Sequence, residues 1–271
     1  MESVKKYIPS HPLLRQKIAA IVFWRRSADE ITSSVFLPNN ICGFGFTLSG
    51  DLLVKNTSDF QIMPQYGTRN TLNKPSEIKT QGDFFNVSLR LVIPNGLSLF
   101  TKIPMDRIYE EDAISLTDIF KPFEIVLLAE KLAEAKTDEH RVALLENFLL
   151  TKINCSTPTV FEFIIEAIHL ANGFISVQQL AKQFVLSERT IHRYFNKYIG
   201  VNPNEYINLI RFRSVITLTQ NSSESLLNHA LDVGYYDQSH FIKHFKEFST
   251  VTPKQFFAVK NSNSLSDFYN I

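Results

Sequence analysis

The chain has 271 residues, of which 44% are hydrophobic and 20% charged, and its formal net charge is only +1. This length is enough for one large domain or two ordinary ones, and the composition is that of a globular protein, not a disordered or fibrous one. Nucleic-acid-binding domains are usually basic, so the near-zero charge gives no bulk support for that function. Any such function must depend on where the charges lie.

The apolar segments and the cysteines predict a cytoplasmic protein. No apolar core follows the charged start of the chain, so we expect no signal peptide. The longest apolar runs, such as residues 19–24, are too short to span a bilayer. The two cysteines, Cys42 and Cys155, form no CxxC motif, which favours a reducing compartment and predicts that both are small buried residues.

The first half of the sequence predicts an α+β arrangement. Between residues 17 and 91, short segments rich in β-branched and aromatic residues alternate with Pro, Gly, Asn and Asp, and CGFGFTL and DLLVK are two of the expected strands. Phe85, Val87, Leu89 and Leu91 alternate with polar residues, as in a half-buried antiparallel sheet or barrel. Residues 116–135 and 138–150 have helical spacing. We expect a β-rich domain with trailing helices at 1–150, a linker at 151–159, an all-α domain at 160–260 and a tail at 261–271.

An internal repeat with an offset of 50 residues occupies the C-terminal part. Apolar, basic and proline positions are preserved in kind, which indicates two copies of one supersecondary unit. The matched pairs are Ile191/Phe241, Arg193/Lys243, Phe195/Phe245, Tyr198/Phe248, Val201/Val251, Pro203/Pro253 and Tyr206/Phe256. Upstream of these pairs the offset is 49 residues and not 50, since Ala181 matches Ala230.

The first copy has the pattern of two helices joined by a tight turn. Apolar residues from Val177 to Phe184 predict the buried face of one helix, a turn follows at 185–186, and Ser187 is a suitable N-cap for the next helix. The buried stripe of that helix is Ile191, Phe195 and Tyr198. Its opposite face carries Arg189, His192, Arg193 and Asn196.

The second copy repeats this arrangement. Gly234 suits the turn, and Asp237 is the expected N-cap. Phe241, Phe245 and Phe248 face inward, whereas Gln238, Ser239, Ile242, Lys243 and Lys246 face outward. A second helix with polar and basic residues near its N-terminus is typical of a DNA-binding helix-turn-helix. A solvated helical pair is the alternative for one copy alone, and two copies in the same phase make it less favourable.

Residues 204–220, between the copies, predict a single helix on the order of 25 Å long. Such a strut would hold both units on one face of DNA, with their second helices about one turn (~34 Å) apart. Arg211 and Arg213 on this helix suit phosphate contacts and packing of their stems equally well.

The segments LAKQFVLSERTIHRYFNKYIGVNPNEYI and HALDVGYYDQSHFIKHFKEFSTVTPKQF together resemble the AraC/XylS family of bacterial transcription regulators over about 100 residues. The resemblance implies sequence-specific binding of double-stranded DNA. It places Arg189, His192 and Arg193 on base-contacting positions of the first recognition helix, and Gln238, Ser239, Ile242 and Lys243 on those of the second. It places Lys197 and Lys246 near phosphates.

The sequence departs from the family pattern at four positions. Val185 and Thr250 stand at turn positions where the family often has Gly, and a β-branched residue is costly if the backbone there has positive φ. His229 stands where the family prefers Ile. Lys243 replaces the common Arg and cannot make the same planar, two-pronged contact.

The first half is similar to the sensing and dimerisation portion of many family members, including a subgroup with a divergent cupin-like domain. The resemblance therefore implies that residues 1–150 pair two protomers, sense a small-molecule effector, or both. RNA polymerase is a further candidate partner. The helix at 116–135 is a candidate dimer contact, with ordinary core packing as the alternative.

The sequence does not predict an enzyme, a cofactor or a metal site. Only His11 precedes His140, which is too few imidazoles for a cupin-type metal site. Gly43 and Gly45 lack the third glycine of a nucleotide-binding loop. The alternative function is a protein-interaction module whose helical units bind a protein partner, which the near-neutral charge favours. Nine basic against six acidic residues between 188 and 260 favour DNA.

Overall fold

A computed structural model describes residues 3–27, 33–39, 41–55, 59–69, 75–92, 96–109, 113–153, 157–221 and 225–259. Its strands pair antiparallel in the order β1-β2-β7-β4-β6-β8, with β3 paired to β7 and β5 to β4. The strands are β1 Ser3–Tyr7, β2 Ile18–Arg26, β3 Ser33–Phe36, β4 Ile41–Lys55, β5 Gln61–Ile62, β6 Tyr66–Thr68, β7 Ser76–Val92 and β8 Ile114–Ser115. Strand β1 precedes residue 17, where we expected the sheet to begin.

The pairing of β4 with β7 forms the centre of the sheet. Phe44 pairs with Leu89 and Phe46 with Val87, and all four side chains are buried, which confirms the predicted alternation in β7 from Val87 to Leu91. Phe85, which we also expected on this face, is half-buried. The prediction of separate strands for CGFGFTL and DLLVK is wrong. Register shifts between residues 47 and 51, with Gly50 at φ +65°, bend β4 without ending it.

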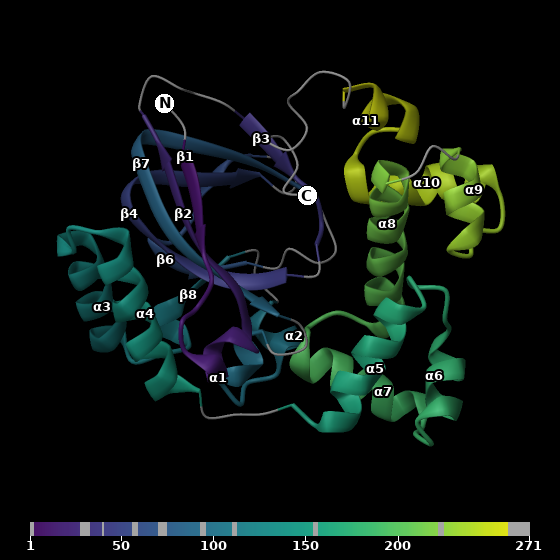
Figure 1. The fold of residues 1–271 in the computed structure, drawn as a ribbon, viewed down its shortest axis with the longest axis horizontal. Coiled ribbons are helices and arrows are strands. Elements are labelled where there is room, and N and C mark those ends of the chain that lie inside the picture. Colours follow the sequence, from purple (N-terminus) through teal and green to yellow (C-terminus); the bar gives the residue numbers. More distant parts are fainter. Residues whose placement is uncertain are drawn as a thin grey trace.

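Apart from these strands, the described elements are helices (Figure 1). In the first half they are α1 Pro12–Arg15, η1 Leu97–Leu99, α2 Met105–Ile108, η2 Leu116–Asp118, α3 Pro122–Glu134 and α4 Asp138–Lys152. In the second half they are α5 Thr159–Leu170, α6 Val177–Gln183, α7 Glu188–Tyr198, α8 Pro203–Asn221, α9 Leu226–Asp232, α10 Gln238–Ser249 and α11 Pro253–Val259. The expected division into a β-rich part and an all-α part is confirmed.

The helix expected at 116–135 is interrupted, which corrects that prediction. Residues 116–118 form only a short 3-10 turn, and the α-helix starts at Pro122. Lys121, directly before the proline, is extended at ψ 125°, because the proline ring disfavours helical backbone in the residue that precedes it. Proline is well suited to the first turn of α3, where its missing N–H costs nothing.

An aromatic cluster joins the sheet to α4. Phe44 of β4 contacts Phe100 and Phe120 with ring centroids 5.8 and 6.0 Å apart, and Phe120 contacts Phe148 of α4 at 5.5 Å. Edge-on and tilted ring pairs of this kind add to the stabilisation from burial. The cluster packs α4 against the core that the sheet forms.

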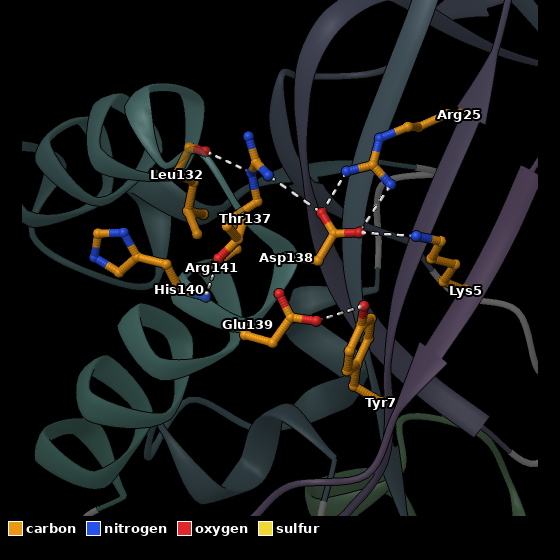
Figure 2. Close-up of polar contacts among 9 residues, drawn as sticks. All are labelled: Lys5, Tyr7, Arg25, Leu132, Thr137, Asp138, Glu139, His140 and Arg141. Carbon is orange, nitrogen blue, oxygen red and sulfur yellow. Dashed lines mark hydrogen bonds and ion pairs between the residues drawn. The ribbon is translucent and has the colours of Figure 1, made fainter.

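Polar contacts around Asp138 fasten α4 to the outer strands (Figure 2). The Asp138 carboxylate is almost fully buried at the start of α4 and accepts hydrogen bonds from Arg25 of β2 and Arg141 of α4. Lys5 of β1 lies 4.0 Å from the same carboxylate. Three cations from three elements therefore surround one buried carboxylate, and each compensates part of its desolvation.

In the all-α part, α8 is the central element (Figure 1). The pair α6–α7 lies towards one end of α8, and α9–α10 lies towards the other. Within the described ranges, no helix is long and apolar enough to cross a membrane.

Candidate nucleic-acid interface

The first helix-turn-helix unit forms as the sequence predicts. Ser176 and Gln179 make a reciprocal capping box at the start of α6. At the turn, Leu186 N–H donates to the Ala181 carbonyl at 3.0 Å, and Val185 between them has φ +53°. Ser187 Oγ then accepts from Thr190 N–H at 3.1 Å and caps α7, which confirms the predicted N-cap.

The second unit explains why the repeat slips by one residue. Tyr235 N–H donates to the Ala230 carbonyl at 3.0 Å across Gly234, the same bond as in the first unit but at an offset of 49. Asp237, at an offset of 50 from Ser187, caps α10 by accepting from His240 N–H at 2.7 Å. The extra residue in this turn is Tyr236, whose side chain is 88% exposed.

Each unit has one glycine and one β-branched residue at its two left-handed positions. The turn positions are Val185 and Gly234, with φ +53° and +89°, and the positions after the recognition helices are Gly200 and Thr250, with φ +85° and +66°. Val185 and Thr250, two of the four departures from the family pattern, therefore lie where glycine is favoured. The turns keep their hydrogen bonds in spite of this cost.

The helix that follows each unit starts in the same way. Asn202 and Glu205 cap each other before α8, with Glu205 N–H donating to Asn202 Oδ1 at 2.9 Å. Thr252 and Gln255, 50 residues later, form the equivalent pair before α11. The pattern Asn/Thr-Pro-x-Glu/Gln was a capping signal that the sequence offered and our prediction did not use.

The structure places the predicted contact residues on two exposed helix faces. On α7, Arg189, Arg193 and Lys197 are exposed and His192 is half-buried, while Ile191 and Phe195 are fully buried beneath them. On α10, the exposed residues are Gln238, Ser239, Ile242, Lys243 and Lys246, above buried Phe241 and Phe245. Within each helix the predicted residues share one face. The two faces belong to units at different ends of α8 (Figure 1).

Arg211 ties α8 to the turn between α5 and α6 and to the second unit. Its guanidinium donates to the Gly173 carbonyl, with Nη2 at 2.9 Å, and lies 5.7 Å from the centroid of the Tyr235 ring. These contacts support the packing role of Arg211, the alternative to a phosphate contact. Arg213 is half-buried.

A buried histidine lies beneath the second exposed face. The Tyr235 hydroxyl is 2.6 Å from His244 Nδ1, and both side chains are buried between α9 and α10. Burial, with Arg211 and His240 nearby, lowers the pKa of His244 to about 4. His244 is therefore neutral near pH 7 and can accept the hydrogen bond from Tyr235. His240, one turn earlier, is exposed.

The first recognition helix also borders the β-rich part of the chain. A groove of about 580 Å³ lies between α7 and the segment that contains α2. Six of its lining residues come from the start and outer face of α7, and Pro104, Asp106 and Arg107 form the other wall. The sequence does not predict this wall, because no local pattern indicates that a segment about 80 residues earlier lies beside α7.

Among the described residues, no group of three or more His, Cys, Asp and Glu side chains is placed to hold a metal ion. Cys42 is buried, and burial raises its pKa to about 12, so its thiol is protonated. Cys155, Lys260 and the tail 261–271 lie outside the described residues.

The C-terminal part matches known proteins in sequence. A family model described as a helix-turn-helix domain matches residues 180–258. An uncharacterized HTH-type transcriptional regulator of Haemophilus influenzae is 34% identical over 80 residues, which are 30% of this chain and 27% of that protein. The HTH-type transcriptional activator RhaS of Mannheimia succiniciproducens is 30% identical over 89 residues, covering 32% and 33%. Residues 180–258 form a helix-turn-helix domain.

This similarity is confined to the helix-turn-helix domain, and the chain matches only about a third or less of the length of these relatives. Solved structures match over more of the chain but more distantly. ToxT of Vibrio cholerae covers 89% of this chain and 98% of its own, at 14% identity and a TM-score of 0.47. The AraC-like transcriptional activator CuxR covers 82% and 87%, at 15% identity and a TM-score of 0.28.

Proposed function

We propose that this chain is a transcription regulator that binds specific DNA sites by inserting α7 and α10 into two successive major grooves. The observation that supports this most strongly is the repeated unit. Each copy presents a polar and basic helix face over a phenylalanine-rich core, and the 19-residue helix α8 separates the two copies. At 1.5 Å per residue α8 is about 28 Å long, close to one turn of DNA.

The side chains on the two faces suit base contacts in a major groove. Arg189 and Arg193 on α7 can each make two-pronged contacts with guanine, and Gln238 on α10 can do so with adenine. His192, Ser239, Ile242 and Lys243 complete the proposed base-contacting set. Lys197 and Lys246, one helical turn further along, are placed for backbone phosphates and would fix the orientation of each helix.

A protein partner in place of DNA is the competing proposal. The net charge of +1 favours it, because it predicts weak non-specific attraction to DNA. The distribution of charge favours DNA. Arg189, Arg193 and Lys197 are exposed on α7, and Lys243 and Lys246 on α10.

The β-rich part would pair two protomers, sense a small-molecule effector, or do both. Support for pairing comes from α3, where Phe123 is 74% exposed and Val126 and Leu127 add to the same apolar surface. Exposed large apolar side chains that cluster in this way are typical of interaction sites. RhaS relatives are named activators, so we propose that the bound regulator activates transcription by contacting RNA polymerase.

Genome-wide footprinting of the tagged chain tests this function. We expect discrete sites upstream of genes for the wild type and loss of those sites for an Arg193→Ala/Lys243→Ala double variant. Occupancy that is diffuse in both proteins, under all growth conditions tried, would favour the protein-partner alternative. A Lys136→Gln variant, changed at an exposed position between α3 and α4, is the matched control and should keep the sites.

A further inference from the structure

We infer that the groove between α2 and α7 binds phosphate, supplied by the DNA strand that runs beside the first recognition helix, and that Arg107 of the β-rich part is a DNA contact. This inference rests on the proposed function and extends it to a residue outside the helix-turn-helix domain.

The groove runs along the outer face and one flank of α7. Its lining includes Thr190 and Lys197, which lie on one flank of the helix, and Arg189, Arg193 and Asn196, which face outward. When a recognition helix lies in a major groove, its outward side chains meet base edges and its flanks meet the two phosphate backbones. One backbone would therefore pass along the flank that carries Lys197, and this is the flank that the segment 104–107 faces.

Cations line both walls of the groove. Among the described lining residues these are Arg189, Arg193 and Lys197 on one side and Arg107 on the other, and Asp106 is the carboxylate of that set. Cations on both walls attract an anion that enters the groove. A phosphate suits the space between Lys197 and Arg107, because the Arg107 guanidinium can donate two parallel hydrogen bonds to its oxygens. Arg189 and Arg193, on the outward side of α7, remain available for bases.

Packing holds α2 beside the end of α7. Met105 and Ile108 of α2 are buried in the core, and Tyr109 packs next to the end of α7. A methyl group on Gly200 would come within 2.6 Å of the Tyr109 ring and 2.9 Å of the Met105 backbone. Since this contact fixes α2 against the end of α7, the exposed Arg107 stands at a defined place beside the recognition helix.

Two measurements on the full chain test the inference, each with Arg107→Gln, Arg107→Lys and Lys102→Gln. Lys102 is the matched control, since it is exposed in the same segment but does not line the groove. The first measurement is the shift in the thermal unfolding midpoint with inorganic pyrophosphate. The second is the salt dependence of binding to a duplex that the wild type enriches from a random-sequence pool, between about 50 and 200 mM salt.

We expect pyrophosphate to raise the midpoint of the wild type and of Lys102→Gln, and to raise that of Arg107→Gln by less than half as much. The slope of log K against log salt should fall in magnitude by about 0.9 for Arg107→Gln, the value for one lost phosphate contact. Arg107→Lys should restore most of the slope, and Lys102→Gln should leave it unchanged.

Other outcomes would overturn the inference in distinguishable ways. A pyrophosphate effect without a change of slope would assign the groove to a free anion and not to DNA. Tighter DNA binding by Arg107→Gln would show that the segment 104–107 hinders DNA binding. An equal loss of slope in Lys102→Gln would show that the positive charge of this region acts on DNA only at long range, without a specific contact. If the wild type enriches no duplex, the proposed function fails. The pyrophosphate measurement still decides whether the groove binds an anion.

Discussion

Val185 and Gly234 occupy the same position in the two helix-turn-helix units, and both have left-handed backbone with φ +53° and +89°. The valine is 90% exposed and has no packing that would offset its strain. A residue other than glycine costs roughly 1–2 kcal/mol in this conformation, and the first turn therefore retains a strain that the second avoids.

Val185→Gly should therefore stabilise the protein. Relief of strain would exceed the extra flexibility of glycine in the unfolded chain and leave a gain of about 0.5–1 kcal/mol in the free energy of unfolding. Urea denaturation measures this gain. The reciprocal change, Gly234→Val, should destabilise, because a β-branched residue is strained at φ +89° and its side chain would displace the exposed Phe174 ring. A loss of stability in Val185→Gly would show that the valine contributes contacts that offset its strain.

Gly200→Ala should weaken both the turn after α7 and the contact with α2. Gly200 has φ +85°, and an added methyl group would meet Tyr109 and Met105, so we expect a loss of about 2 kcal/mol in the free energy of unfolding. Thr250→Ala is the control at the equivalent repeat position, where the side chain is exposed, and should change stability by less than about 0.5 kcal/mol. Equal effects of the two changes would argue against a close contact between α2 and α7.

The Asp138 carboxylate should be important for stability. Asp138→Ala would leave Arg141, whose side chain is only 11% exposed, without its carboxylate partner, and loss of one member of a buried ion pair typically costs about 3 kcal/mol or more. Glu139→Gln is the neighbouring control, since its contact with the Tyr7 hydroxyl is exposed and 3.4 Å long. Chemical denaturation of both variants measures the difference. Similar small losses would show that the network is dispensable.

Acid should destabilise the second unit through His244. Its pKa is lowered to about 4 in the folded protein, below the value of about 6.5 for an unfolded chain. As pH falls below about 6.5, the unfolded state takes up a proton that the folded state does not, so stability declines from there towards pH 4. His169, which lies 2.8 Å from the Tyr206 hydroxyl and also has a lowered pKa, adds to the same trend.

Urea midpoints between pH 7.5 and 4.5, in His244→Gln and His169→Gln, separate the two histidines. Each substitution should remove part of the decline, and glutamine at 244 keeps an acceptor for the Tyr235 hydroxyl. The charged groups that act on His244 are Arg211 of α8 and His240 of α10, and both lower its pKa. A decline that is as steep in both variants as in the wild type would assign the acid sensitivity to other groups.

The sequence predicted the helix-turn-helix units well because the signals are local. Ser187 and Asp237 cap helices whose buried stripes lie within the next dozen residues, and the repeat allowed one copy to be checked against the other. The long-range contacts could not be predicted. Arg25 and Asp138 are 113 residues apart, and only the packing of α4 against the outer strands brings them together. The bend in β4 and the wall formed by Arg107 depend on tertiary packing in the same way.

Selection of bound duplexes from a random-sequence pool tests the central claim most directly. The wild type should enrich a site with two blocks about 10 base pairs apart, one for each recognition helix. Arg193→Ala should lose information in one block only, at a cost of about 1–3 kcal/mol for a base contact, and Lys243→Ala should lose it in the other block only. Failure of the wild type to enrich any sequence, or enrichment of an unchanged site by both variants, would contradict the claim that α7 and α10 recognise DNA.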